Sequence, residues 1–174
     1  MLLRTARLDD IDGIMAVEQQ AFIPSIQEQK SVFIERLSVF SEGFFVVCDD
    51  SEIQGYISCE IWDSFEKNEK SFGLGHSIKE RHRSDGNILY ISSVALLDKC
   101  KGKGLGQLLF SECIKRVSEK FAGINEYVLI VNEVWKGAYH IYSKNGFKEL
   151  FRIKGFFPSE DDNATDGIVM GKTI

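Results

Sequence analysis

A short glycine-rich segment of this chain could bind an anion. Residues 101–106 read Lys-Gly-Lys-Gly-Leu-Gly and lie between an apolar run, residues 88–97, and a run with apolar residues at helical spacing, residues 105–121. These patterns predict a strand before the segment and a helix after it. The first N–H groups of a helix lack partners within the helix, and glycines let an anion approach the backbone closely. Because Lys101 and Lys103 add positive charge, the segment predicts a site for a pyrophosphate group.

The spacing of the glycines narrows the choice of ligand. A P-loop would read G-x-x-x-x-G-K-[ST] and a dinucleotide-binding loop G-x-G-x-x-G, whereas this segment reads G-x-G-x-G and continues with Gln107. Residues 94–106 instead resemble the acetyl-CoA-binding motif of the GNAT acetyltransferases, in which Gln or Arg precedes a glycine-rich turn after a strand. Lys101 stands at the position of that Gln or Arg. A glycine-rich connection with solvated lysines is the alternative interpretation.

A second segment carries the same resemblance. Residues 138–147 read Ala-Tyr-His-Ile-Tyr-Ser-Lys-Asn-Gly-Phe and are similar to the family's A-x-x-x-Tyr-x-Lys-x-Gly-Phe segment. Trp135 replaces the asparagine that often precedes this tyrosine, and Asn132 lies earlier in the chain. The resemblance implies that acetyl-CoA is held largely by the backbone of the strand and the glycine turn. The residues expected to contact it are Val94, Ala95, Leu96, Lys101, Gly102, Lys103, Gly104, Leu105, Gly106, Gln107 and Asn132.

The resemblance implies direct transfer of an acetyl group from acetyl-CoA to an amine. Tyr142 is at the family's position for protonating the departing sulfur, and a phenol with a pKa of about 10 keeps its proton at neutral pH. An aromatic residue packed at a helix end is the alternative for Tyr142. The amine needs a base, because an alkylamine with a pKa of about 10.4 is almost entirely protonated at pH 7. Glu60 is the candidate, since strand alternation places it on the face of Ser58 and opposite Cys59.

Part of the chain resembles one branch of the family more closely. Residues 86–106 are similar to a segment of the arylalkylamine N-acetyltransferases and their bacterial relatives. That branch commonly carries two histidines on the fourth strand in a water-linked proton path, and Tyr90 and Ser92 stand at the matching positions here. Phe22 and Trp62 could line an apolar acceptor pocket beside them, although aromatic side chains at such spacings more often belong to the core.

The periodicity of the whole chain predicts an α/β fold. Strand and helix signals follow the order β-α-α-β-β-β-α-β-α-β-β, which matches the GNAT fold, a mixed sheet of about seven strands with helices on both faces. Two β-rich runs, residues 43–49 and 53–62, predict an antiparallel hairpin. Ser25 and Glu28 have the spacing of a capping box and predict the start of the second helix.

Residues 63–86 interrupt this regular pattern. They contain a mixed charge run and two glycines around Leu74, with little periodicity. Long irregular segments in compact domains are often lids or binding loops, so the segment could cover the acceptor. A solvated and partly disordered excursion is the alternative. His76 and His82 are candidate bases, but histidines in a mobile charged loop are more often simply exposed.

Length and composition set broader limits. With 174 residues, 44% of them hydrophobic, the chain suits a single domain, residues 1–174, that can bury a sizeable core. A net charge of −5 argues against a nucleic-acid surface. No apolar run reaches the ~18 residues of a membrane span and no signal peptide is recognisable, which favours a cytoplasmic protein without a membrane partner. The four cysteines form no C-x-x-C pair, which favours buried reduced thiols and no metal site.

The sequence leaves more than one function open. The favoured interpretation is an acetyl-CoA-dependent N-acetyltransferase acting on a small amine or polyamine. A protein acetyltransferase acting on an N-terminus or a lysine would use the same chemistry but would need an open groove for a peptide. A non-catalytic acyl-CoA-binding module is the third alternative, and retention of Tyr142 and the glycine turn argues against it. A homodimer is an expectation from the resemblance.

Overall fold

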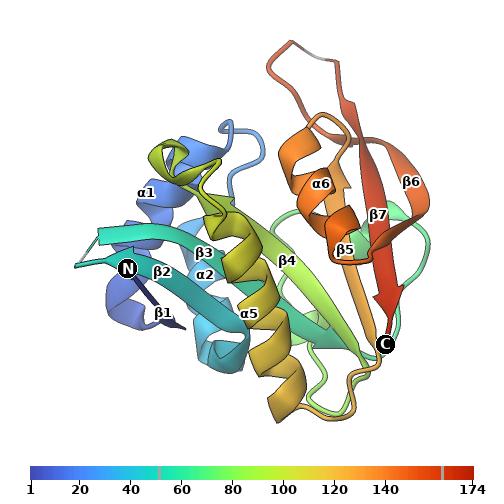
Figure 1. Ribbon diagram of the computed structural model, residues 1–174. Coiled ribbons are helices and arrows are strands. Elements are labelled where there is room, and N and C mark those ends of the chain that lie inside the picture. The colour runs from blue at the N-terminus through green and yellow to red at the C-terminus, as the bar shows by residue number, and fades with distance from the viewer. Residues whose placement is uncertain (51, 162) are drawn as a thin grey trace.

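A computed structural model of the chain describes residues 1–50, 52–161 and 163–174. A seven-stranded sheet in the order β1-β2-β3-β4-β5-β7-β6 forms its centre (Figure 1). The strands are β1 (Leu2–Thr5), β2 (Phe44–Asp49), β3 (Glu52–Trp62), β4 (Ile88–Leu96), β5 (Glu126–Asn132), β6 (Lys148–Phe157) and β7 (Thr165–Thr173). The helices are α1 (Ile11–Ala21), α2 (Lys30–Phe40), α3 (Glu69–Phe72), α4 (Ile78–Arg81), α5 (Leu105–Lys120) and α6 (Lys136–Lys144).

The order and bounds of these elements confirm the predicted fold. The seven strands and the four longer helices occur in the expected order, and the short helices α3 and α4 are added between β3 and β4. Strands β2 and β3 pair antiparallel, as the hairpin signal predicted. Residue 51, in the predicted hairpin connection, and residue 162 lie outside the described residues.

Alternation along β3 separates two layers of the core. Ile57, Cys59 and Ile61 pack in the cluster that contains the apolar stripe of α5. Tyr56 points to the opposite face, where α1 and α2 pack against the sheet. Figure 1 shows α5 in front of the sheet and α1 and α2 behind it. The predicted placement of Glu60 opposite Cys59 is therefore confirmed, and it puts a carboxylate in the layer beneath α2.

Strands β4 and β5 are paired over only part of their length. Their parallel register runs from Ile88 opposite Glu126 to Ile91 opposite Leu129, and the remaining residues of both strands are not paired with each other. Beyond Ile91 the two strands diverge (Figure 1). The sheet therefore opens at its centre and leaves backbone groups of β4 free to bind a ligand.

A β-bulge lies at the point where β4 and β5 separate. Ser93 is opposite Ser58 and Ile91 is opposite Cys59, so Ser92 is the extra residue of β4. A bulge interrupts strand alternation and re-aims side chains. As a result, the hydroxyls of the consecutive residues Ser92 and Ser93 lie on the same face of the sheet, where they contact the hydroxyls of Ser58 and Tyr56, and both residues line the same cavity.

One local prediction was wrong, and one open alternative is excluded. Helix α2 begins at Lys30 with Gln29 before it, and not at the capping box of Ser25 and Glu28. The carboxylate of Glu28 is bound instead by the guanidinium of Arg36, a stronger partner than a backbone N–H. Residues 63–86 are not a disordered excursion, because short helices form there and carry the buried side chains of Phe72 and Ile78 into the core.

The cysteines and the helices bear on two further expectations. All four cysteines are buried and free, which confirms the predicted buried thiols. Within residues 1–50, 52–161 and 163–174, no group of three or more His, Cys, Asp or Glu side chains is arranged to hold a metal ion. No helix of the described chain combines the length and the apolar character needed to cross a bilayer.

Candidate active site

The glycine turn adopts a conformation that suits an anion. Gly102 and Gly104 have positive φ angles of 74° and 78°, which other residues adopt only at a cost. Gly104 is the N-cap of α5, and it has no side chain to satisfy the first N–H groups of the helix. A Cβ atom at Gly102 or Gly104 would meet no heavy atom within 4 Å, so the space over the turn is open. These free donors and this open space fit a pyrophosphate.

A cavity of about 600 Å³ begins at this turn and runs between β4 and α6; we call it the glycine-turn cavity. Gly106 lies where α5 passes close to both walls, because a Cβ there would come within 3.2 Å of Leu96 and 3.3 Å of Ile141. The glycine-turn cavity is lined by Ala21, Phe22, Val94, Ala95, Leu96, Lys101, Gly102, Gly104, Gly106, Gln107, Phe110, Trp135, Gly137, Ala138, His140, Ile141, Tyr142 and Lys144. Its length along β4 and its free amides at the turn fit a coenzyme A molecule.

Some residues predicted to contact acetyl-CoA lie elsewhere. The side chain of Leu105 is buried in the core, and neither it nor Lys103 lines the cavity. Asn132 also lies outside the cavity lining; it is buried, and its side-chain oxygen accepts a hydrogen bond from the N–H of Val134 at 3.1 Å. Leu105 can contact a bound cofactor only through its backbone groups.

Two lining residues are tied to other side chains. Lys101 forms an ion pair of 2.6 Å with Asp98, and both side chains are exposed. Gln107 exchanges two hydrogen bonds of 3.0 Å with Asn145 at the end of α6. Gln107 therefore joins the helix of the glycine turn to the helix that carries Tyr142.

The conformation of Gly104 leads to a first prediction. Gly104→Ala forces an alanine into the left-handed region, at a cost of about 1–2 kcal/mol, and adds a methyl group in the space open to the anion. The KM for acetyl-CoA should rise about tenfold with little change in kcat at saturation, measured by thiol release. Gly123→Ala, in a turn remote from the cavity with no positive φ, is the control. An unchanged KM would contradict the role given to the turn.

A second cavity, of about 80 Å³, adjoins the first; we call it the inner cavity. It lies under the diverging ends of β4 and β5, between helix α1 and residues 72–76. Both cavities are lined by Phe22, Val94, Trp135, Ala138 and Tyr142. Since the two cavities share these walls, groups bound in one would meet groups bound in the other at this junction.

Tyr142 stands at the junction. It comes from α6, packs beside Phe110 of α5 and is 9% exposed. Burial raises the pKa of its phenol well above 10, so it holds its proton at every physiological pH. Its hydroxyl makes no hydrogen bond within the described part of the chain. The hydroxyl of Tyr142 is therefore available to form a hydrogen bond with a bound molecule.

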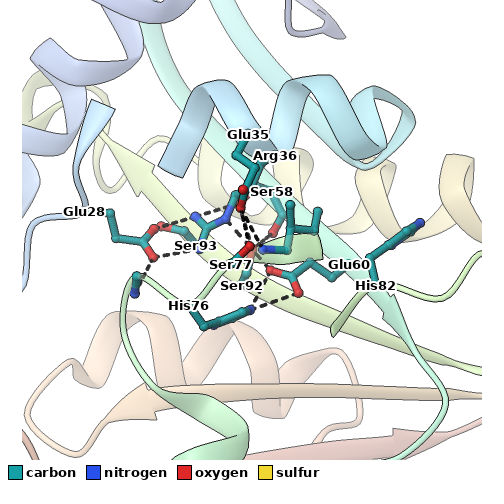
Figure 2. Close-up of polar contacts among 12 residues, drawn as sticks. Glu28, Glu35, Arg36, Ser58, Glu60, His76, Ser77, His82, Ser92 and Ser93 are labelled. Atoms are coloured by element: carbon teal, nitrogen blue, oxygen red, sulfur yellow. Dashed lines mark hydrogen bonds and ion pairs between the residues drawn. The ribbon is translucent and has the colours of Figure 1, made fainter. Parts of the chain in front are cut away.

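A buried network of charges forms one wall of the inner cavity (Figure 2). Arg36, which is 2% exposed, donates from its guanidinium to both oxygens of Glu28. Its Nε lies 3.9 Å from Oε1 of Glu60, and its Nη1, which also bonds Glu28, lies 3.5 Å from the hydroxyl of Ser58. That hydroxyl in turn lies 2.8 Å from the hydroxyl of Ser92. The cation of Arg36 thus compensates carboxylates that burial would otherwise destabilise.

Glu60 lies behind the cavity wall and not on it. Its carboxylate is fully buried, accepts a hydrogen bond of 2.9 Å from the indole of Trp62, and binds Nε2 of His76 at 2.9 Å. Although desolvation opposes ionisation, the contacts with His76, Arg36 and Trp62 hold the pKa of Glu60 below its usual value. A carboxylate so buried and so strongly stabilised is poorly placed to take a proton from an amine, which does not support the predicted role of Glu60 as base.

Glu18 is the carboxylate that sequence reasoning missed. It lines the inner cavity from α1 and is 1% exposed. Its Oε1 accepts from the N–H of Glu28 at 2.8 Å, and its Oε2 accepts from the hydroxyl of Tyr56. Burial raises the pKa of Glu18, which makes it a stronger base than an exposed glutamate. Among the described residues that line the inner cavity, it is the one carboxylate without an ion-pair partner.

A signal for Glu18 and Arg36 was present in the sequence. Glu18 follows Ile11 and Ile14 at the spacing of the buried stripe of α1. Arg36 lies three residues after Phe33 on the buried stripe of α2. A charged residue in an apolar stripe is rarely buried unless it is paired, and such positions often carry function.

The four residues predicted to line an acceptor pocket divide into two groups. Phe22, Tyr90 and Ser92 line the inner cavity. Trp62 is fully buried behind it, stacked on the ring of Tyr90 with centroids 3.9 Å apart. Trp62 therefore supports the wall from behind, and its indole N–H is occupied by Glu60.

This fold, with its split sheet, glycine turn and tyrosine at the junction, is the one expected from the resemblance to the GNAT acetyltransferases. A model of the acetyltransferase (GNAT) family matches residues 11–147. The chain therefore belongs to the GNAT family, as its two motifs predicted, and it is an N-acetyltransferase.

Sequence relatives come from archaea. An N-alpha-acetyltransferase of Sulfurisphaera tokodaii is 27% identical over 160 residues, covering 92% of this chain and 87% of the relative. An N-alpha-acetyltransferase of Saccharolobus solfataricus is 26% identical with the same coverage.

Solved structures share the fold at low identity. The loading GNATL domain of CurA from Lyngbya majuscula superimposes with a TM-score of 0.82 and 16% identity, covering 99% of this chain and 96% of that domain. The ribosomal-protein-S18-alanine N-acetyltransferase of Escherichia coli gives a TM-score of 0.74 and 16% identity over 99% and 93% of the two chains.

Proposed function

We propose that the protein acetylates the N-terminal α-amine of a polypeptide, with acetyl-CoA as the donor. The observation that carries the proposal is the junction at Tyr142, where the glycine-turn cavity meets an inner cavity with one unpaired carboxylate, Glu18. Acetyl-CoA bound along β4 would supply the thioester. The relatives named N-alpha-acetyltransferases align with 92% of the chain. They favour an α-amine as the acceptor over the small amine or polyamine that the sequence favoured.

The size of the inner cavity supports an N-terminal residue as the acceptor. Its volume of about 80 Å³ admits a small side chain together with an amine. The rest of a peptide would have to remain outside the inner cavity. Alanine and serine are therefore expected to be better first residues than tryptophan or phenylalanine.

Two side chains of this protein would move the protons. An α-amine has a pKa of about 7.7–8.0, so far less work is needed to deprotonate it than to deprotonate a lysine side chain. Glu18 takes that proton from the inner cavity, and its raised pKa brings it closer to the amine in basicity. Tyr142 donates its phenolic proton to the departing thiolate at the junction.

A matched set of acceptors tests the proposal. One peptide begins with a free alanine and contains a lysine, a second is the same peptide with its N-terminus formylated, and a third begins with tryptophan. Spermidine and an arylalkylamine complete the panel. Thiol release and the mass of the product should identify the alanine peptide as the best acceptor, modified at its N-terminus. Turnover only with the formylated peptide, or only with the free amines, would overturn the proposal.

A small amine is the second candidate, and one observation favours it. Residues 73, 74 and 76 form part of the lining of the inner cavity, so the segment between β3 and β4 covers the acceptor side. A covered cavity suits a compact acceptor better than a chain. Preference of the enzyme for spermidine or an arylalkylamine in the panel would select this candidate.

A further inference from the structure

Residues 63–86 are attached to the rest of the protein through three buried or half-buried glutamates (Figure 2). Glu28 accepts a hydrogen bond of 3.1 Å from the N–H of Gly75. Glu35 accepts from the hydroxyl of Ser77 at 2.8 Å and from the N–H of Ile78 at 3.1 Å. Glu60 binds the imidazole of His76, which makes the deepest of these attachments.

The surroundings of His76 determine its protonation state. Nε2 lies 2.9 Å from both carboxylate oxygens of Glu60, and Nδ1 lies 2.9 Å from the carbonyl oxygen of Gly73. A carbonyl and an ionised carboxylate can only accept hydrogen bonds, so both ring nitrogens must donate. A neutral imidazole has one N–H and can satisfy only one of these partners. With Glu60 ionised, which its contacts with Arg36 and Trp62 favour, the contacts of His76 require the imidazolium.

We propose that His76, in its doubly protonated form, is a positioning residue that holds residues 63–86 closed over the inner cavity, so that the acceptor binds more weakly as the pH rises and His76 loses its proton. His76 is 13% exposed and lines the inner cavity together with its neighbours Gly73 and Leu74. Loss of the proton leaves a nitrogen lone pair facing an oxygen, and the wall between Gly73 and His76 loosens. The inference rests on the proposed function, because it takes the inner cavity as the acceptor site.

The charges around His76 favour the cation. Glu60 faces it from β3, and Arg36, on α2, opposes it from the far side of Glu60. The rings of Trp62 and Tyr90 pack against it at 5.9 and 6.1 Å. Burial lowers the pKa of His76, but the bonds to Glu60 and to the carbonyl of Gly73 outweigh burial and raise it above 6.5. A raised folded-state pKa gives stability that is complete below about 6.5 and is lost as the pH rises through the folded pKa.

The protonation state can be measured without any substrate. The chain has three histidines, so nitrogen NMR of the imidazoles, with single-histidine variants for assignment, is tractable. Both nitrogens of His76 should carry protons at pH 6, and the titration midpoint should lie above that of a free histidine. Glu60→Gln removes the charge on its partner and should lower the midpoint. A His76 with a single protonated nitrogen at pH 6 would overturn the proposal.

Hydrogen exchange then tests whether the proton holds the segment closed. The amides of Gly75 and Ile78 are bonded to Glu28 and Glu35. Their protection should fall as the pH passes the midpoint of His76, beyond the change seen at amides of α5. In His76→Gln, protection of these amides should be low at every pH. If the protection of these amides changes neither with the titration of His76 nor with the substitution, the proposal is overturned.

Steady-state kinetics tests whether closure of residues 63–86 strengthens binding of the acceptor. His76→Gln should raise the acceptor KM about tenfold, as expected for loss of a charged buried hydrogen bond, while the KM for acetyl-CoA stays within twofold. His76→Lys keeps a positive charge beside Glu60 and should restore much of the affinity without a titration near neutral pH. Lys67→Ala, which removes an exposed charge from the same segment, is the control and should leave both KM values unchanged.

The outcomes separate this inference from the proposed function. If no peptide or amine is acetylated, the proposed function fails, while NMR and hydrogen exchange still test how His76 holds the segment. If peptides are acetylated and His76→Gln changes both KM values equally, His76 has a general structural role and the inference fails. Comparing wild-type protein with His76→Lys at each pH removes the contribution of amine ionisation, which is the same for both.

Discussion

Replacing Tyr142 with phenylalanine is expected to lower kcat by about 10²-fold or more, with little change in the KM for acetyl-CoA. The phenol lies where the two cavities meet, and burial keeps it protonated. A departing thiolate without a proton donor is a poor leaving group from a buried site. Thiol release at saturating acetyl-CoA and acceptor measures the effect.

The same helix provides a control for Tyr142. Tyr139→Phe removes a hydroxyl from α6 that lines neither cavity, so its kcat should stay close to that of the wild type. Because the hydroxyl of Tyr142 has no partner among the described residues, Tyr142→Phe should also unfold at the temperature of the wild type. A variant of Tyr142 with normal kcat would show that the residue only packs against Phe110.

Replacing Glu18 with glutamine is expected to lower kcat/KM for the acceptor by about 10²- to 10³-fold at pH 7. The amide cannot take a proton, although it can still accept from the N–H of Glu28 and bond to Tyr56. The defect should shrink as the pH approaches 9, where an α-amine with a pKa of about 8 is already neutral. Measuring kcat/KM of both proteins from pH 6 to 9 checks this.

The pH dependence distinguishes a base from a structural residue. If Glu18 only supports the fold, the defect of Glu18→Gln will be the same at every pH, and the assignment of the base will be wrong. The sign of the pKa shift also predicts the effect on stability. A carboxylate with a raised folded-state pKa costs stability at neutral pH, so glutamine at this position should not lower the melting temperature. Glu18→Asp, which keeps the charge on a shorter side chain, should fall between the two proteins in activity.

The two variants together map the flow of protons across the site. Glu18 lies on the wall formed by α1, and Tyr142 comes from α6 on the other side of the junction. The amine would lose its proton on one side and the thiolate would gain one on the other. Because the two groups act on different atoms, their substitutions should respond differently to pH: the defect of Glu18→Gln shrinks with rising pH, and that of Tyr142→Phe does not.

Local patterns in the sequence predicted the fold, and the resemblance to the GNAT motifs predicted a donor site along β4 and the glycine turn. Apolar periods of two and of about 3.6 residues mark strands and helices, since each face of an element is buried or exposed as a whole. The glycine turn depends on backbone conformation at Gly102 and Gly104, and glycine is the residue that such a conformation demands. Tyr142 was predicted from the motif of residues 138–147, which lies on α6 and the turn that follows it, so its residues are close in space as well as in sequence.

The acceptor side was decided by the tertiary structure. Glu28 was predicted to cap a helix, but folding brings it against Arg36, and a charged partner outcompetes a backbone amide. His76 and Glu60 are sixteen residues apart in the sequence, and Tyr56 and Glu18 are thirty-eight apart. The bulge at Ser92, which turns two consecutive serines into one cavity, is a property of pairing between strands. The arrangement of all the buried charges in three dimensions decides which carboxylate is left without a cation. No local sequence pattern carries this information.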